Sequence, residues 1–136
     1  MEEILRIPLG ETKPTKFYVI EELIGFKQAI TILYVQQDRL KIIRIHGEEK
    51  SESKLDWNVR RIMNLNEDTF LVQEKGNSAI SRLTFKYEGT TPYQTKLLLH
   101  EFSSKIVKFL CEKGHLYTLN KRGEKYILKC YKLNKY

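Results

Sequence analysis

The stretch that decides the fold class is TPYQTKLLLHEFSSKIVKFLCEKG, residues 91–114. Its start suits a helix, because Thr91 can cap the first turn and Pro92 fits the first helical position. Its end suits one as well, since Lys113 places a cation in the last turn and Gly114 follows it. The sequence therefore predicts one long amphipathic helix from Pro92 to Lys113. Its apolar stripe would consist of Leu99, Phe102, Ile106 and Phe109/Leu110.

Most of the chain before this helix has the alternation of β-strands. Residues 40–46 alternate more cleanly, and because both faces carry apolar side chains, such as Leu40 and Ile42 on one and Ile43 and Ile45 on the other, at least part of that strand should be buried on both sides. Residues 55–65 fit a helix or a strand, and the turn signal that follows them favours the strand. In residues 79–87 alternate side chains form two faces, with Ile80, Arg82, Thr84 and Lys86 on one and Leu83, Phe85 and Tyr87 on the other.

A run of strands followed by one helix is typical of an α+β fold built on antiparallel pairs. The apolar stripe of the helix needs a sheet to lie on. We therefore expect a mainly antiparallel β sheet or partly open barrel with one long capping helix, which is the PH-like architecture. A single domain would comprise residues 1–136, with a PH-like body at 15–114 and a basic β-hairpin at 115–136.

The positive charge of the chain is concentrated after the predicted helix. The 136 residues carry a net charge of +7, and the segment from Lys113 onward accounts for +6, with seven basic residues and one acidic residue. Cations can neutralise phosphates and tyrosine rings can stack on bases, so this segment predicts a nucleic-acid-binding hairpin. Lysines on an edge hairpin also prevent aggregation, and that structural explanation stays open. The candidate residues are Lys121, Arg122, Lys125, Lys129, Lys132, Lys135, Tyr126 and Tyr131.

A second candidate site surrounds the tryptophan. Trp57 is followed by the adjacent pair Arg60 and Arg61, and an arginine beside an aromatic ring can anchor an acidic or phosphorylated group of a protein partner. In a strand the two arginines point to opposite faces, so only one of them could be the anchor without a bulge. A solvated pair beside a core tryptophan is the structural alternative.

No motif in the sequence indicates catalysis. The three histidines have no Ser or Cys in a recognised nucleophile setting, and no glycine-rich phosphate loop occurs. Cys111 and His115, with Cys130 and His100, could supply metal ligands, but their spacing is not that of a zinc site and buried cysteines are common. The sequence thus predicts a non-enzymatic protein without metal or cofactor, and it disfavours a small-molecule substrate.

Hydrophobic segments and cysteines bear on the compartment. The longest nearly apolar run, residues 29–35, is far shorter than the roughly 20 residues that span a membrane. Two cysteines do not make a disulfide framework, and the acidic start Met1-Glu2-Glu3 differs from a secretory signal. We therefore expect an intracellular protein without a transmembrane segment.

Three short segments carry a resemblance to a known family. They are Asp56-Trp57-Asn58-Val59-Arg60-Arg61-Ile62-Met63, then Arg82-Leu83-Thr84-Phe85 with Glu88-Gly89, then the helix end Val107-Lys108-Phe109-Leu110. In this order they resemble the amino-terminal PH-like domain of meiotic recombination accessory proteins, which support the endonuclease that makes programmed double-strand breaks. The resemblance implies a nuclear adaptor that docks helices or peptides of partner proteins, in a factor that also engages DNA.

These observations predict a PH-like interaction module that binds a protein segment and uses its basic hairpin on DNA, as an accessory factor in meiotic double-strand-break formation. A phosphoinositide-binding PH-like domain is one alternative, although its candidate loop, Gly25-Phe26-Lys27-Gln28, supplies only one cation. A small nucleic-acid-processing enzyme with His100 or His115 as its base is the other.

Overall fold

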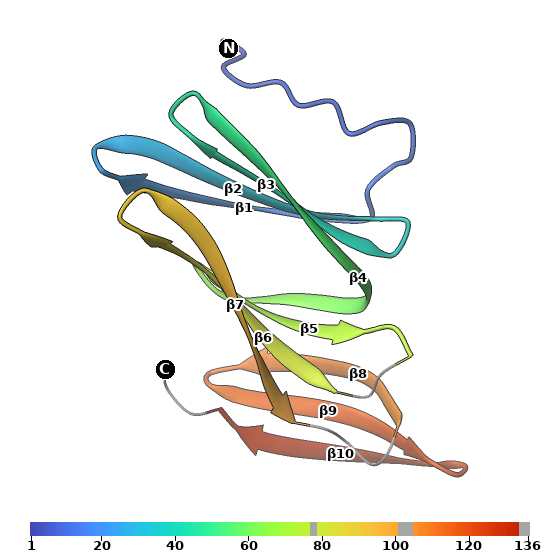
Figure 1. Cartoon of the computed structure of the whole chain (residues 1–136). Helices are drawn as coiled ribbons and strands as arrows, with labels where there is room; N and C mark the ends of the chain where they lie inside the picture. Colours follow the sequence, from blue (N-terminus) through green and yellow to red (C-terminus); the bar gives the residue numbers. More distant parts are fainter. Residues whose placement is uncertain (77–78, 101–104, 134–136) are drawn as a thin grey trace. The chain divides into compact units, whose positions relative to one another are not determined.

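The computed structural model describes residues 1–76, 79–100 and 105–133. The regular secondary structure of these residues consists of β-strands alone (Figure 1). The predicted α+β class is therefore wrong, and the described part of the chain is all-β. No helix in these ranges is long and apolar enough to cross a membrane. The strands are β1 Lys16–Ile24, β2 Lys27–Gln36, β3 Arg39–His46, β4 Glu49–Asn66, β5 Thr69–Glu74, β6 Ile80–Glu88, β7 Thr91–His100, β8 Lys105–Glu112, β9 His115–Arg122 and β10 Lys125–Lys132.

Within each sheet the strands pair antiparallel with their neighbours in the chain, whereas β7 and β8 belong to different sheets. One sheet has the order β1 to β7, and a second sheet holds β8, β9 and β10 with β9 in the middle. Tight turns join most of these pairs. In Gly25-Phe26, Gln37-Asp38 and Lys113-Gly114 both residues have positive φ, as two-residue type I′ hairpin turns require.

The chain forms two compact units, Met1–Asn58 and Val59–Tyr136. The first unit contains β1, β2, β3 and the beginning of β4. The prediction that residues 40–46 are partly buried on both sides is confirmed, because successive side chains of β3 are shielded from solvent. These buried side chains are Leu40, Ile42, Ile43 and Arg44.

The second unit contains the rest of β4 and the strands β5 to β10. One face of its β5–β6 pair carries Phe70 and Phe85, which are 0% and 2% exposed. Their ring centroids lie 6.0 Å apart in an edge-to-face arrangement, the geometry that aromatic pairs prefer. Burial and ring contact of this pair both stabilise that face.

The opposite face of β5 and β6 is covered by the sheet of β8, β9 and β10. Leu71 and Ile80 from the first layer form a buried cluster with Ile106 of β8 and Leu116 of β9. Tyr131 of β10 is among the partly buried side chains that pack against this cluster. The cluster therefore fixes which face of the second sheet is turned toward the core.

The helix predicted from Pro92 to Lys113 is wrong. In the described residues this stretch contains β7 and β8, and Phe102 of the predicted stripe lies outside those residues. Pro92 is tolerated because β7 is an edge strand, where a missing N–H breaks no ladder. Lys113 and Gly114 have φ of 50° and 77°, because a tight hairpin turn needs the same left-handed backbone as a helix end. Without the capping helix, the PH-like architecture is wrong as well.

A β-bulge explains the helical spacing of the apolar residues in β8. The register with β9 shifts between Ile106 and Lys108, so that Ile106, Phe109 and Cys111 face Asn120, Thr118 and Leu116 in turn. Core-facing residues are thus three and then two positions apart. A bulged strand imitates the spacing of a helix over such a short stretch.

Two further segments are also built of β-strands. Residues 55–65, which fitted a helix or a strand, belong to β4. Residues 115–132 form the hairpin of β9 and β10, paired from His115 opposite Lys132 to Arg122 opposite Lys125.

Candidate nucleic-acid interface

The sheet of β8, β9 and β10 has one face against the core and one face toward solvent. On β9, Leu116, Thr118 and Asn120 are buried, and the Asn120 side-chain amide donates a hydrogen bond to Thr118 Oγ1 at 2.7 Å. The residues between them point the other way, as alternation in a strand requires. We call this side the outer face. It comprises Lys108, Leu110 and Glu112 of β8, His115, Tyr117, Leu119 and Lys121 of β9, and Tyr126, Leu128, Cys130 and Lys132 of β10.

Antiparallel pairing places an exposed aromatic ring beside a cation on the outer face. Tyr126 lies opposite Lys121, and Lys121 Nζ is 5.9 Å from the centroid of the Tyr126 ring. A cation over a ring at this distance is attracted by its electron-rich face. Tyr126 is 60% exposed and Leu128 is 69% exposed. The outer face therefore presents apolar and aromatic surface to solvent rather than a uniformly polar one.

A second tyrosine of the outer face is held by its neighbours. Tyr117 lies opposite Cys130, and the hydrogen bond between these side chains is the main reason why the pKa of Tyr117 is raised. The ring of His115 lies 6.5 Å from that of Tyr117, tilted by 46°. Tyr117 is thus a neutral, oriented ring at neutral pH.

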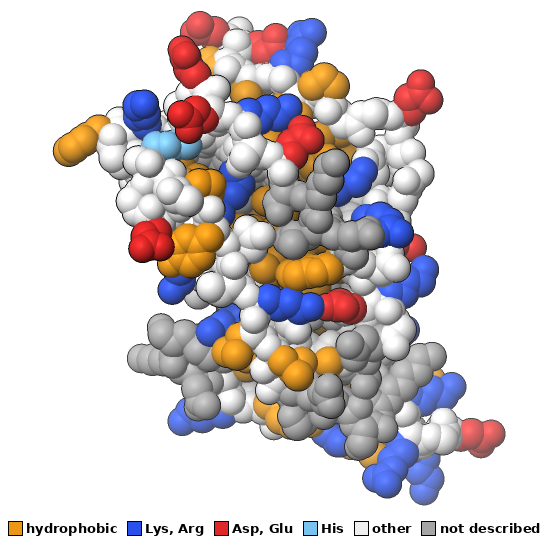
Figure 2. All heavy atoms as spheres, viewed as in Figure 1, with side chains coloured by type: hydrophobic (Ala, Val, Ile, Leu, Met, Phe, Trp, Pro, Cys, Tyr) orange, Lys and Arg blue, Asp and Glu red, His pale blue; other side chains and the backbone are white. Residues whose placement is uncertain are grey.

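The charge of this sheet is strongly positive. Residues 105–133 contain eight basic and two acidic side chains. Arg122 and Lys125, both exposed, flank the turn between β9 and β10. Figure 2 shows Lys and Arg side chains, together with an acidic side chain, where this sheet ends at the turn. An anionic polymer approaching this end would meet several cations and few carboxylates.

The predicted nucleic-acid residues divide between the two sides of the sheet. Lys121, Tyr126 and Lys132 lie on the outer face, and Arg122 and Lys125 lie at its turn. This set is brought together by the β9–β10 hairpin.

The remaining predicted residues do not join that set. Tyr131 packs against the buried cluster on the core side, and Lys129, half-buried, has the same orientation along β10. Lys135 lies outside the described residues. The sequence assignment missed Lys108 and Leu110, because they fell in the predicted helix. Strand alternation on β8 would have revealed them once its bulge was known.

The residues predicted to bind a protein partner occupy both units. Trp57, half-buried, lies opposite Leu40 in the first unit. In the second unit Arg61 donates a hydrogen bond from Nη1 to Gln73 Oε1 at 3.3 Å, and burial together with the charge of Arg60 lowers the pKa of Arg61. Arg60 is exposed where the register between β4 and β5 shifts. Partner binding by these residues stays a prediction.

The cysteines point to opposite sides of the second sheet. Cys111 packs against the buried cluster, whereas Cys130 is exposed on the outer face. Among residues 1–76, 79–100 and 105–133, no three His, Cys, Asp or Glu side chains are grouped so that they could hold a metal ion.

We expect the two thiols to react at different rates. Burial raises the pKa of the Cys111 thiol and so lowers its thiolate fraction, and it also limits the access of a reagent to the sulfur. Cys130, in contrast, is exposed. Iodoacetamide at mildly alkaline pH should therefore modify the Cys130 thiol several-fold faster than the Cys111 thiol. Intact-mass spectrometry would follow the two reactions. Cys130→Ser should remove the fast phase and Cys111→Ser should preserve it. Equal rates for the two single variants would contradict this orientation of the sheet.

Comparison of the chain with protein-family models, curated proteins and solved structures finds no match. The resemblance to meiotic recombination accessory proteins therefore stays a prediction.

Proposed function

We propose that this protein binds single-stranded nucleic acid on the outer face of the β8–β10 sheet. The observation that carries the proposal is the 60% exposed ring of Tyr126 with Lys121 Nζ 5.9 Å from its centroid. A ring of this kind can stack on a base while its neighbouring cation neutralises a phosphate. Base stacking on an aromatic side chain contributes about 1–3 kcal/mol and tolerates any base.

The spacing along the sheet supports more than one contact with a strand. Tyr117 lies four residues from Lys121 along β9, which places it about 14 Å from Tyr126 by strand geometry. Leu119 and Leu128 occupy the surface between the two rings. Unpaired bases could stack at both rings, whereas the bases of a duplex are already stacked on one another. The outer face thus favours single strands over duplexes.

The turn between β9 and β10 adds charge to this surface. Arg122 and Lys125 are exposed beside Lys121, and each phosphate that such cations neutralise releases a counterion. The slope of log K against log salt should be about −2 to −3 if three to four phosphates of a single strand are neutralised. Binding should therefore be tight at low salt and weak at high salt.

Fluorescence anisotropy with labelled oligo(dT) and oligo(U), over a series of KCl concentrations, tests this proposal. The triple variant Lys121→Gln, Arg122→Gln, Lys125→Gln should bind at least about tenfold more weakly at low salt and should flatten the salt slope by about 2. Tyr126→Ala should lose about 1–3 kcal/mol of binding free energy with little change in slope.

Two matched variants serve as controls. Lys16→Gln removes an exposed cation of β1, and Tyr93→Ala removes an exposed tyrosine of β7. Both should bind like the wild type. Absence of binding at low salt would refute the proposal, and so would an equal loss in Lys16→Gln. Full affinity in Tyr126→Ala would show that the face attracts phosphates without acting as a stacking surface, which also contradicts it.

The wider role remains a set of predictions. Docking of a partner segment by Trp57, Arg60 and Arg61, and an accessory function in meiotic double-strand-break formation, rest on the sequence alone. The phosphoinositide alternative required the PH-like architecture, which the all-β fold does not have.

A further inference from the structure

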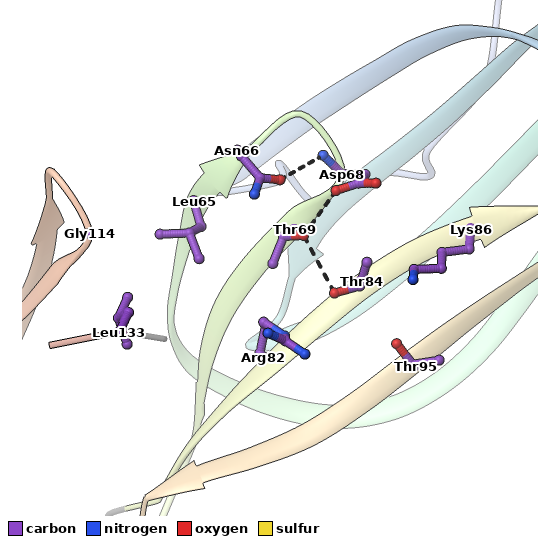
Figure 3. Close-up of a pocket in the computed structure, with 10 residues that line it drawn as sticks. All are labelled: Leu65, Asn66, Asp68, Thr69, Arg82, Thr84, Lys86, Thr95, Gly114 and Leu133. Atoms are coloured by element: carbon purple, nitrogen blue, oxygen red, sulfur yellow. Dashed lines mark hydrogen bonds between the residues drawn. The ribbon is translucent and has the colours of Figure 1, made fainter. Parts of the chain in front are cut away.

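The second unit contains a pocket that the proposed function does not use. It has a volume of about 520 Å³ and lies between the strands β4 to β7 and the turn that joins β8 to β9 (Figure 3). Small-molecule sites commonly measure about 300–1,000 Å³. At one rim the Leu133 N–H donates a 2.9 Å hydrogen bond to the Gly114 carbonyl, which ties the turn to the segment after β10. This hydrogen bond thus helps to define the rim of the pocket.

A row of threonines crosses this pocket. Thr69 of β5, Thr84 of β6 and Thr95 of β7 lie opposite one another in register. On β6, Arg82 and Lys86 flank Thr84 on the same face, about 13 Å apart at their Cα atoms by strand geometry. Figure 3 shows these three side chains along one side of the strand. Long cationic side chains can therefore reach the space above Thr84 from both directions.

A carboxylate acceptor lies next to the threonine row. Thr69 Oγ1 donates to Asp68 Oδ1 at 2.9 Å and lies 3.4 Å from Thr84 Oγ1. The Asp68 backbone is fixed as well, since its carbonyl accepts from the Phe85 N–H at 2.9 Å and its N–H donates to Asn66 Oδ1 at 3.3 Å. The carboxylate of Asp68 thus has a defined place beside Thr69, while Arg82, Lys86 and Thr95, which also line the pocket, carry donor groups.

We propose that this pocket binds a phosphate monoester whose remaining part carries hydroxyl groups. A phosphate monoester has a charge of about −1.5 to −2 and three acceptor oxygens. Such a group can accept from Arg82, Lys86 and a threonine hydroxyl together, and it matches these donors better than a ligand with a single carboxylate would. The hydroxyl groups of the ligand would donate to Asp68. Leu65 and Leu133 give the pocket an apolar wall against which a carbon skeleton can pack.

This assignment is independent of the outer face. Arg82 and Lys86 lie on β6, whereas the residues proposed to hold nucleic acid lie on β8, β9 and β10. The two sites can therefore fail separately in experiments. Nothing in the sequence marks the pocket except the alternation that places Arg82, Thr84 and Lys86 on one side of their strand.

Isothermal titration calorimetry with inorganic phosphate and glycerol phosphate, each at constant ionic strength, tests the assignment. Wild-type protein should bind both, and glycerol phosphate more tightly because it adds hydroxyl groups. Lys86→Gln and Arg82→Gln should each weaken binding at least about tenfold, the effect of losing one charge-assisted hydrogen bond. Lys86 is exposed, so its variant should stay folded even if the half-buried Arg82 is needed for stability.

The control is Lys125→Gln, which removes the same charge from the β9–β10 hairpin. It should leave phosphate binding unchanged while weakening oligonucleotide binding. Lys86→Gln should weaken phosphate binding and should leave the binding of an oligonucleotide that lacks a terminal phosphate unchanged. The assignment is overturned if glycerol phosphate does not bind at millimolar concentration, or if Lys125→Gln weakens it as much as Lys86→Gln.

The same chemistry could come from a free molecule or from the phosphorylated end of a strand. An oligonucleotide with a terminal phosphate, compared with its unphosphorylated form, separates these sources. A gain in affinity that disappears in Lys86→Gln identifies the strand end as a ligand. If the terminal phosphate does not raise the affinity of the oligonucleotide while glycerol phosphate still binds, the ligand is a free phosphate monoester.

Discussion

Replacing Phe70 with alanine should lower the free energy of unfolding by about 3–5 kcal/mol, the usual cost of truncating a buried aromatic side chain. Phe70 is 0% exposed and packs edge-to-face on Phe85 at 6.0 Å, so the change removes both buried area and an aromatic pair. Typical domains are stable by only about 5–15 kcal/mol. Urea unfolding followed by circular dichroism would measure the loss directly.

Phe26→Ala is the matched control for this prediction. It makes the same chemical change in the turn between β1 and β2, where the ring is fully exposed. The free energy of unfolding should change by less than about 0.5 kcal/mol, as for most surface substitutions. Similar losses in Phe70→Ala and Phe26→Ala would show that the β5–β6 pair does not bury its aromatic face as described.

Replacing Ile106 with aspartate should be at least as damaging, with a loss of about 4 kcal/mol or more. Ile106 is 1% exposed and belongs to the cluster that joins β8 and β9 to β5 and β6. A carboxylate there would be buried among Leu71, Ile80 and Leu116 without a charged partner in the cluster. We expect the variant to lose the second sheet, detected as fast amide hydrogen exchange in β8 to β10.

Leu110→Asp separates the strand from the helix that the sequence predicted. On a helix Ile106 and Leu110 would share one face, so both aspartates would damage the core equally. In the structure the bulge turns Leu110 to the outer face, where it is 49% exposed. Leu110→Asp should therefore unfold at nearly the wild-type urea concentration. Comparable destabilisation by both aspartates would favour the helix.

Most of the strands before residue 90 could be predicted because their side chains alternate, as Arg82, Thr84 and Lys86 do opposite Leu83 and Phe85, whereas the start of β4 has no apolar residue to mark it. The error after residue 90 has a physical origin. Pro92 is compatible with a helix start or an edge strand, and the positive φ at Gly114 serves a helix end or a hairpin turn equally well. Local signals of this kind cannot decide between partners that only the tertiary fold supplies.

The candidate interface was predicted in part for the same reason. The charge and the tyrosines of the last segment are visible in the sequence, and strand parity already separates Tyr126 from Tyr131. Which of these two rings faces the core depends on the docking of a second sheet onto Leu71 and Ile80. The pocket was not predicted from the sequence. Its threonine row can be seen only when the register of three strands is known, and its rim only when the position of the turn at Gly114 is known.

Within each sheet the strands pair with their chain neighbours, and this local pairing has a consequence for folding kinetics. Each hairpin closes over a short loop, so the entropy lost before native contacts form is small. Folding rates fall as contacting residues become more distant in sequence, and this topology keeps most ladder contacts local. The protein should therefore fold faster than β-sandwiches of equal length, with β1 and β2 able to pair before the last strands leave the ribosome.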